Sequence, residues 1–311
     1  TSNEKNPYAG AIYYSISTDE GKSWSKPDFL HSDTAHNYGR SFFDIATMKN
    51  GEVAAIWLDG RLGKAIKGSA LYFNTTSKGG RFGTDRVIDK GTCECCRTEL
   101  LVAENGDLHL AYRKIMYPNA TLGKQVRDMV YSTSRDNGRS FSPSKIISED
   151  HWAIEGCPHT GPSLAILRDR PAAIWFSAGG GSGLYFTGLD RSGNFGQRTL
   201  TTASGKHPQM VALHDGRLAA IWEETKSENP MHAGMSQHGS MSDHGDTPKS
   251  AIVCSILKNG VAEKTIFQTP ADKSANHHPV LLSTKRGILA AWVKEEGGRT
   301  DIQYTLIKRV P

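Results

Sequence analysis

The chain has 311 residues and a net charge of +5, a length that could hold two average domains. The charge is spread along the sequence without aromatic-interleaved basic segments, which argues against nucleic acid as a partner and mildly favours small anionic ligands. No apolar run is long enough to cross a bilayer, so the sequence predicts no membrane span. Short alternating apolar runs among many Gly, Ser and Thr residues are typical of an all-β protein.

The first repeating unit is a pair of short apolar strands joined by a tight turn. Its five copies lie at 41–57, 98–112, 162–175, 206–222 and 279–292. Three of them turn at an Asn-Gly or Asp-Gly dipeptide, which is a hairpin signal. Hairpins that return at intervals of roughly fifty to seventy residues indicate the blades of a β-propeller. We therefore expect a single propeller domain over residues 1–311.

The second repeating unit is an outer strand rich in aromatic and β-branched residues, which alternates with the hairpins. Its six copies begin at Ala11, Ala70, Met129, Leu184, Ala251 and Ile302. Six outer strands against five inner hairpins predict six blades, the first of them incomplete at the N-terminus.

Two outer strands run into the pattern Ser-x-Asp-x-Gly-x-x-aromatic, at 17–24 and 134–141, and a degenerate copy lies at 75–82. The aspartate can accept backbone N–H groups across the turn, the glycine supplies a positive φ, and the aromatic ring is expected to pack under the loop. This pattern is the Asp-box of BNR repeats. On it, the chain resembles the sialidase-type six-bladed β-propeller family over nearly all of its length, and the resemblance implies that the Asp-boxes are structural staples.

The resemblance also implies where a sialidase-like active site would lie. Arg40 matches the arginine that clamps the substrate carboxylate, although the Ile-Pro that should follow is missing. Arg97 is a candidate second clamp, while Glu99 and Tyr304 are conceivable partners in the nucleophile pair. Where the later blades should offer arginines, histidines stand instead. An Arg40 that pairs with a blade-edge carboxylate is the alternative interpretation.

Cysteines and histidines gather where the predicted inner strands begin. Cys93, Cys95 and Cys96 precede one inner strand, Cys157 and His159 precede the next, and His207, His277 and His278 stand before later ones. The starts of a propeller's inner strands open at one face, so these side chains are expected to converge there. Thiolate and imidazole ligands favour copper, with zinc as the alternative.

Less specific interpretations stay open for each of these residues. One disulfide among Cys93, Cys95, Cys96 and Cys157 is an equal alternative in an exported chain, and a His-Pro pair can simply hold a loop. In the metal interpretation, Glu94, Glu99, Arg40 and Arg97 would orient the ligands or balance their charge. Cys254, in an outer strand, is expected to be a small buried hydrophobic residue.

Residues 226–248 form a polar, Gly-rich insert that is not expected to fold by itself. Its candidate metal ligands are Met231, His232, Met235, His238, Met241 and His244. Thioether sulfur selects Cu(I) and imidazole also accepts Cu(II). The insert resembles the Met/His-rich loops of periplasmic copper-handling proteins, and a linker rich in Met and His by accident is the alternative.

Together these features predict a periplasmic or secreted copper-binding propeller with a redox or copper-handling role. The alternatives are a glycoside hydrolase resembling an exo-sialidase and a metal-free binding propeller. The chain begins at Thr1 without Met, so it is expected to be a processed or trimmed product.

Overall fold

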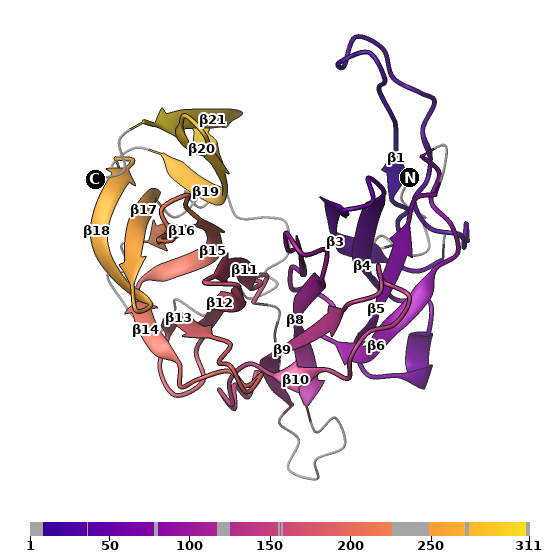
Figure 1. Cartoon of the computed structure of the whole chain (residues 1–311), viewed down its shortest axis with the longest axis horizontal. Coiled ribbons are helices and arrows are strands. Elements are labelled where there is room, and N and C mark those ends of the chain that lie inside the picture. The colour runs from indigo at the N-terminus through magenta and orange to yellow at the C-terminus, as the bar shows by residue number, and fades with distance from the viewer. Residues whose placement is uncertain are drawn as a thin grey trace. The chain divides into compact units, whose positions relative to one another are not determined.

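The computed structural model describes residues 9–35, 37–77, 80–116, 125–154, 156, 158–225, 249–270 and 274–308. The described chain is all-β: strands follow one another from end to end, and its one helical element is the 3₁₀ turn η1 (Gly63–Ala65). The predicted all-β class is thereby confirmed. The chain divides into two compact units, residues 1–145 and 146–311, which are described separately (Figure 1).

Unit 1 contains a two-stranded and an eight-stranded sheet. The small sheet pairs β1 (Tyr13–Tyr14) with β2 (Asp28–Phe29). The large sheet runs in the order β10-β9-β8-β6-β5-β4-β3, and β7 pairs with β8. Its strands are β3 (Arg40–Thr47), β4 (Val53–Asp59), β5 (Ser69–Thr75), β6 (Arg86–Thr92), β7 (Glu99–Val102), β8 (Leu108–Met116), β9 (Val126–Ser134) and β10 (Lys145–Ile146).

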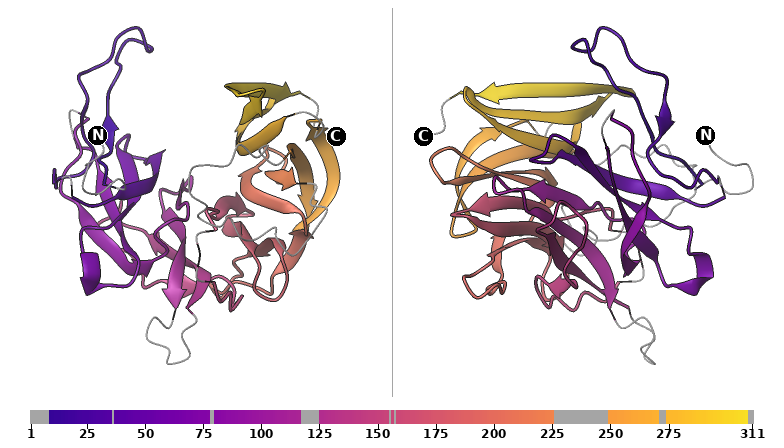
Figure 2. Two further views of the ribbon diagram at one scale, coloured as in Figure 1. Left: turned by 180° about the vertical axis from the view of Figure 1, so that it is seen from behind. Right: turned by 45° about the vertical axis from the view of Figure 1, so that its right-hand side comes forward.

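Unit 2 contains a four-stranded sheet followed by a seven-stranded one. The first is a meander of β11 (Ser163–Leu167), β12 (Arg170–Ser177), β13 (Gly183–Gly188) and β14 (Thr199–Thr202). The second contains β15 (Gly205–Ala212), β16 (Leu218–Thr225), β17 (Ser250–Lys258), β18 (Val261–Gln268), β19 (Ala275–Thr284), β20 (Gly287–Glu296) and β21 (Arg299–Ile307). Figure 2 shows its last strands side by side in yellow.

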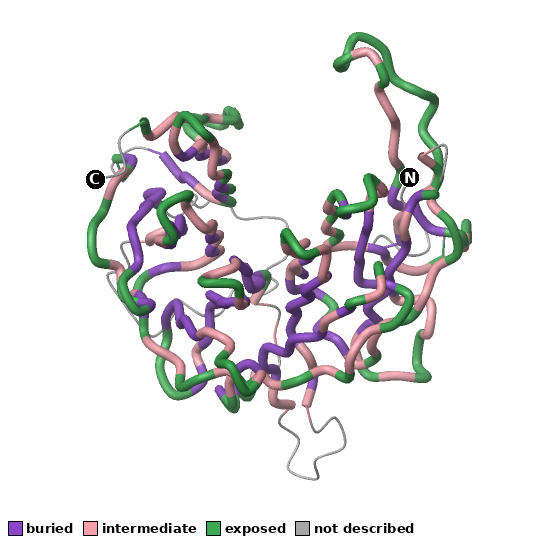
Figure 3. The backbone as a smooth tube through the Cα atoms, viewed as in Figure 1, coloured by how far each residue is buried: buried purple, intermediate pink, exposed green. Residues whose placement is uncertain are grey.

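The five predicted inner hairpins are all present as antiparallel strand pairs. They are β3–β4, β7–β8, β11–β12, β15–β16 and β19–β20. In four of them the second strand carries a buried tryptophan whose indole N–H donates to a nearby side-chain oxygen; these are Trp57, Trp175, Trp222 and Trp292. A buried indole needs such a partner, so the repeat fixes the core and the polar atoms beside it together. Figure 3 shows the resulting buried strand centres in purple.

The two Asp-box turns share one hydrogen-bond pattern. Asp19 accepts the backbone N–H of Ser23 at 2.9 Å, and Asp136 accepts that of Ser140 at 2.9 Å. The hydrogen bonds from Ser23 lower the pKa of Asp19 to about 2.

The packing of the aromatic residue differs between the two turns. Phe141 packs edge-on against Phe73 in the large sheet, whereas Trp24 is 65% exposed, so the expectation of a covered ring is wrong for Trp24. The physical reason is local: Trp24 lies in the loop that connects β1 to β2, and this two-stranded sheet is too small to supply a surface that covers the ring. In the described part of the chain, no helix is long and apolar enough to cross a membrane.

Candidate functional site

A cluster of three buried thiols, called here the thiol cluster, lies in the turn between β6 and β7. It consists of Cys93, Cys95 and Cys96, which are at most 6% exposed. The Cys93 sulfur lies 3.3 Å from that of Cys96 and 3.7 Å from that of Cys95. The three sulfur atoms all lie within 4.8 Å of one another, and no other group of described residues brings three ligand atoms of His, Cys, Asp or Glu that close.

The neighbouring strands hold this turn in place. Gly91, near the end of β6, has a φ of +76°, a conformation that favours glycine. The backbone N–H of Cys93 then donates to the carbonyl of Arg113 in β8 at 2.8 Å. Because the turn is fixed by the sheet, its sulfurs are positioned before any ligand arrives.

A positive charge compensates the thiol cluster. Arg127 in β9 donates from Nη1 to the Cys93 sulfur at 3.1 Å, and the same nitrogen lies 3.5 Å from the carboxylate of Glu94. Hydrogen bonds from Cys95 and Cys96, together with the charge of Arg127, hold the pKa of Cys93 well below its usual range. Burial raises the pKa of Cys96 to about 12. These opposite shifts favour a thiolate at Cys93, and a bound cation would replace the protons of the other two thiols.

The donor set and spacing fit a soft transition-metal ion. Zinc–thiolate bonds are about 2.3 Å long, so three sulfurs around one such ion would stand about 3.8–4.0 Å apart. The observed separations of 3.3 and 3.7 Å lie just below that range. Thiolates select Cu(I), zinc and iron–sulfur clusters over hard cations, so small outward movements would complete a site of this class.

The described cysteines contain no disulfide. Cys93, Cys95, Cys96 and Cys254 are all free, whereas Cys157 lies outside the described residues. Cys254 is buried in β17 among apolar side chains, as expected, and burial raises the pKa of its thiol to about 12.

A second group, called here the imidazole cluster, lies in unit 2 and contains His207 of β15 and His277 and His278 of β19. His207 Nδ1 lies 2.7 Å from the Glu223 carboxylate, and its ring stacks on that of His278 at 4.9 Å. Nδ1 of His277 lies 2.6 Å from Nδ1 of His278, and Nε2 of His277 lies 3.2 Å from Glu295. Burial alone would raise the pKa of Glu223, but the hydrogen bond from His207 and the neighbouring imidazoles lower it.

A repeated backbone feature places these histidines. His159, His207 and His278 have φ values of +52°, +49° and +53°, and Phe42 has +50°. Phe42 in β3, His207 in β15 and His278 in β19 each lie where the pairing with the next strand shifts its register. Such a shift is a β-bulge, which turns a side chain away from the regular alternation of the strand. His207 and His278 therefore occupy equivalent bulges, whereas His159 shares only the positive φ. Arg40 is not equivalent to them, since it precedes the bulge residue Phe42 by two positions.

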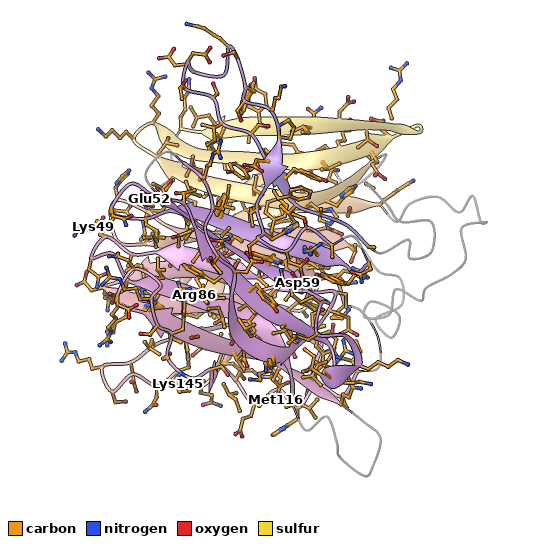
Figure 4. The ribbon with its side chains drawn as sticks, turned by 90° about the vertical axis from the view of Figure 1, so that its right-hand side faces the viewer. Lys49, Glu52, Asp59, Arg86, Met116 and Lys145 are labelled. Carbon is orange, nitrogen blue, oxygen red and sulfur yellow. The ribbon has the colours of Figure 1, made fainter. Side chains whose placement is uncertain are left out.

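Arg40 is part of the protein interior. Its side chain is fully buried, its Nε lies 3.3 Å from Asp59 (labelled in Figure 4), and its other nitrogens donate to the carbonyls of Gly10, Asp33 and Ala35. Arg40 therefore pairs with a carboxylate, which was the alternative interpretation of the sequence. Its side chain has no exposed atom that could bind a substrate carboxylate.

The other candidates for a sialidase-like site come from separate elements. Arg97 and Glu99 lie just before and at the start of β7, directly after the thiol cluster. Tyr304 lies in β21 of unit 2 and is 75% exposed.

Arg127, Glu223 and Glu295 were not found by sequence reasoning. Each lies in a strand well away in sequence from the group it contacts, so strand pairing alone brings it there. The hydrophilic Glu223 directly after the repeated tryptophan was the one available signal. Cys157, Met231, His232, Met235, His238, Met241 and His244 lie outside the described residues.

Comparison of the sequence with protein-family models gives no match, and comparison with curated proteins gives none either. Among solved structures, the chain is similar to a variant of the NanB sialidase from Streptococcus pneumoniae, with a TM-score of 0.57, 12% identity and coverage of 92% of this chain and 60% of that one. The chain thus spans less than two thirds of that sialidase.

Two sugar-processing enzymes are similar over more of their own length. The GH93 alpha-L-arabinofuranosidase of Fusarium graminearum gives a TM-score of 0.53 with 12% identity, over 87% of this chain and 79% of that one. The alpha-L-arabinanase of Penicillium chrysogenum gives 0.50 with 10% identity, over 88% and 94%. At such identities the likeness shows the fold, a sialidase-like β-propeller.

Proposed function

We propose that this protein is a metal-binding β-propeller whose thiol cluster takes up one soft transition-metal ion, with copper(I) as the first candidate and zinc as the second. One observation carries the proposal: three buried sulfurs converge within 4.8 Å of one another. Soft sulfur donors select Cu(I) or zinc over magnesium and calcium. Burial then shields the bound ion from water and from competing ligands.

Charge balance supports the same proposal. Three thiolates around a Cu(I) ion carry a net charge of −2, which is costly to bury without compensation. Arg127 supplies one positive charge directly beside Cys93, and Arg113 of β8 supplies another near Cys96, since its charge lowers the pKa of that thiol against the effect of burial. A location outside the cytoplasm and a copper-handling role remain part of the proposal.

The test is metal analysis of protein purified without chelator, combined with a count of free thiols. We expect stoichiometric copper or zinc, and we expect Cys93→Ser, Cys95→Ser and Cys96→Ser each to reduce it. Cys254→Ala is the matched control, because Cys254 is also buried and free but lies alone in β17. Metal content that is equal in all four variants, or a parent protein without metal after reconstitution under anaerobic conditions, would overturn the proposal.

Sugar hydrolysis is the second candidate function, and the comparisons favour it over copper handling, because the similar structures are a sialidase and two arabinose-releasing or arabinan-degrading enzymes. The chain's own residues support it less. Arg40 is enclosed by Asp59 and by backbone carbonyls, so it cannot serve as a carboxylate clamp without unfolding its surroundings.

A hydrolase assay separates the two candidates. The protein is incubated with sialosides and with arabino-oligosaccharides, and Glu99→Gln is compared with Cys95→Ser. Turnover that is lost in Glu99→Gln and kept in Cys95→Ser would establish the hydrolase. Absence of turnover on both substrate classes, with stoichiometric metal bound, favours the metal-binding function.

A further inference from the structure

We propose that the imidazole cluster of unit 2 is a second metal site, one that takes a borderline divalent ion such as Zn²⁺ or Cu²⁺ through nitrogen. Nδ1 of His277 and Nδ1 of His278 are the chelating pair, His207 contributes a further nitrogen, and Glu223 and Glu295 are positioning residues. This site goes beyond the proposed function, because it is built within unit 2 and uses no sulfur.

The first observation is the convergence of two imidazole nitrogens. Nδ1 of His277 and Nδ1 of His278 lie 2.6 Å apart, so one proton occupies the space between two lone pairs. An ion bound at about 2.0–2.1 Å from each nitrogen would hold them about 3.3 Å apart. Because His278 is exposed, its ring can swing outward by that small amount. The ion then takes the place of the shared proton, which moves to Nε2 of His278.

The second observation is that carboxylates orient two of the three rings. A carboxylate accepts but does not donate, so Glu223 fixes the proton of His207 on Nδ1 and leaves Nε2 for a ligand. The Glu295 carboxylate lies 3.2 Å from Nε2 of His277, and its negative charge favours a proton on that nitrogen, which leaves Nδ1 for the chelate. Histidines that bind metals usually donate their second ring N–H to a carboxylate or a carbonyl in this way.

The third observation is backbone strain at the histidines themselves. His207 and His278 hold φ values of +49° and +53°, which are unfavourable for residues with a side chain. Both precede a proline, Pro208 or Pro279, which restricts the backbone conformation of the residue before it. The same conformation recurs at the equivalent bulge of a third hairpin, at Phe42 of β3, so the surrounding sheet holds these residues in it, and at His207 and His278 it presents an imidazole.

Among the described residues, only the thiol cluster has three ligand atoms within 4.8 Å of one another, so the rings of the imidazole cluster do not yet form a three-ligand group. His207 stacks on His278 at 4.9 Å. The His207 ring thus borders the chelating pair, and a movement of His207 toward that pair would be needed to supply the third nitrogen.

The nitrogen ligands predict which ion binds. Imidazole suits zinc, copper and nickel in their divalent states, whereas the thiol cluster prefers softer ions. The two sites therefore differ in a spectroscopic property. Co²⁺ bound to thiolates shows intense sulfur-to-cobalt charge-transfer bands, whereas Co²⁺ bound to imidazoles does not.

The test is a Co²⁺ and Zn²⁺ titration of the full chain in which His232, His238 and His244 are replaced by Asn, so that no imidazole of the insert can take up the ion. We expect one bound equivalent without charge-transfer bands, which His277→Ala combined with His278→Ala removes. Glu223→Gln and Glu295→Gln should each weaken that equivalent by about 10–100-fold. His214→Ala, an exposed histidine in the turn of the same β15–β16 hairpin, should change nothing.

Loss of binding is attributed to the site when the thermal unfolding of the metal-free variant matches that of the parent. If the double variant unfolds at a lower temperature than the parent, the single variant His278→Asn is used in its place. His278 is exposed, and asparagine is among the residues that most readily adopt the positive φ of this position. Retention of the equivalent in both variants would overturn the proposal, as would charge-transfer bands that account for every bound cobalt ion. Failure of the thiol cluster to bind leaves this equivalent untouched, so the two proposals fail independently.

Discussion

Arg127 donates a side-chain hydrogen bond to Cys93 that links the thiol cluster to the sheet that carries it. The guanidinium donates to the sulfur at 3.1 Å although the residues are 34 positions apart, and both are buried. Arginine keeps its charge in such surroundings, so the pair stabilises a thiolate inside the protein. The charge of Arg127 adds to the hydrogen bonds from Cys95 and Cys96 that lower the pKa of Cys93.

Replacing Arg127 should therefore weaken metal binding without removing a ligand. We expect Arg127→Gln to lower the affinity for Cu(I) by about 10–100-fold, the usual effect of losing a group that orients or compensates a metal ligand. Competition against a Cu(I) chelator measures it. Arg135→Gln is the control, since the Arg135 side chain is 82% exposed and its nearest carboxylate, that of Asp107, lies 3.8 Å away. Equal affinities of the two variants would contradict this role of Arg127.

Asp150 should be essential for the stability of unit 2. Its side chain is fully buried and accepts hydrogen bonds from Trp175 at 2.7 Å and from Arg198 at 2.5 Å. Asp150→Ala removes the acceptor of the Trp175 indole, of Nη1 of Arg198 and of the Ser148 hydroxyl, which we expect to cost about 3 kcal/mol of unfolding free energy. Urea denaturation measures it.

The comparison variant for Asp150 is Asp215→Ala. Asp215 forms an exposed ion pair with Arg217, so its loss should cost less than about 1 kcal/mol. Similar costs for the two variants would show that the buried network contributes little.

Much of the fold could be predicted because the repeat is local. A strand, a turn such as Asp215-Gly216 and a second strand ending in Trp222 lie within one stretch of sequence, so alternation and turn chemistry identify each hairpin. The number of blades stays a prediction. Trp24 shows where local reasoning fails: whether an aromatic ring is covered depends on the strands around it.

The site was predictable only in part, for the same physical reason. Cys93, Cys95 and Cys96 are neighbours in sequence, so their spacing alone brings them together. The contacts of His207 with Glu223 and His278 depend on strand pairing and on a bulge, neither of which sequence spacing shows. Arg40 resembled a clamp by position, but its burial beside Asp59 could be known only from the structure.

Gly138 should tolerate a side chain much less well than another glycine of similar conformation. It has a φ of +76°, and an added Cβ would lie 2.4 Å from the Phe73 ring. Gly51 has a φ of +85°, and a Cβ added there would have no neighbouring atom within 4 Å. Gly51→Ala should therefore destabilise the protein only through its backbone conformation, by about 1 kcal/mol. We expect Gly138→Ala to cost about 1–3 kcal/mol more, because Phe73 must also move.

Denaturation of the two glycine variants side by side checks this prediction. Equal midpoints would mean that the Phe73–Phe141 pair yields without cost, and that the second Asp-box does not depend on the packing beneath it.

The stability of unit 1 should depend on pH through His31. Its ring is buried, its Nε2 accepts the backbone N–H of Ile12 at 3.1 Å, and its Nδ1 lies 2.6 Å from the carbonyl of Asp33, so the neutral form fits the site. Burial, followed by the charge of Arg40, lowers the pKa of His31 below its ordinary value of 6.5. The unfolded chain therefore binds more protons than the folded one below pH 6.5, and this contribution to stability decreases as the pH falls through that range.

The measurement is the thermal midpoint of parent and His31→Gln between pH 8 and pH 5, with a chelator present to remove metal. Glutamine can accept the N–H of Ile12 but does not titrate. The thermal midpoint of the variant should therefore fall less than that of the parent below about pH 6.5. Identical slopes in the two proteins would assign the pH dependence to other groups. A variant that is more pH-sensitive than the parent would mean that His31 is charged in the folded protein, which the hydrogen bond from Ile12 to its ring nitrogen opposes.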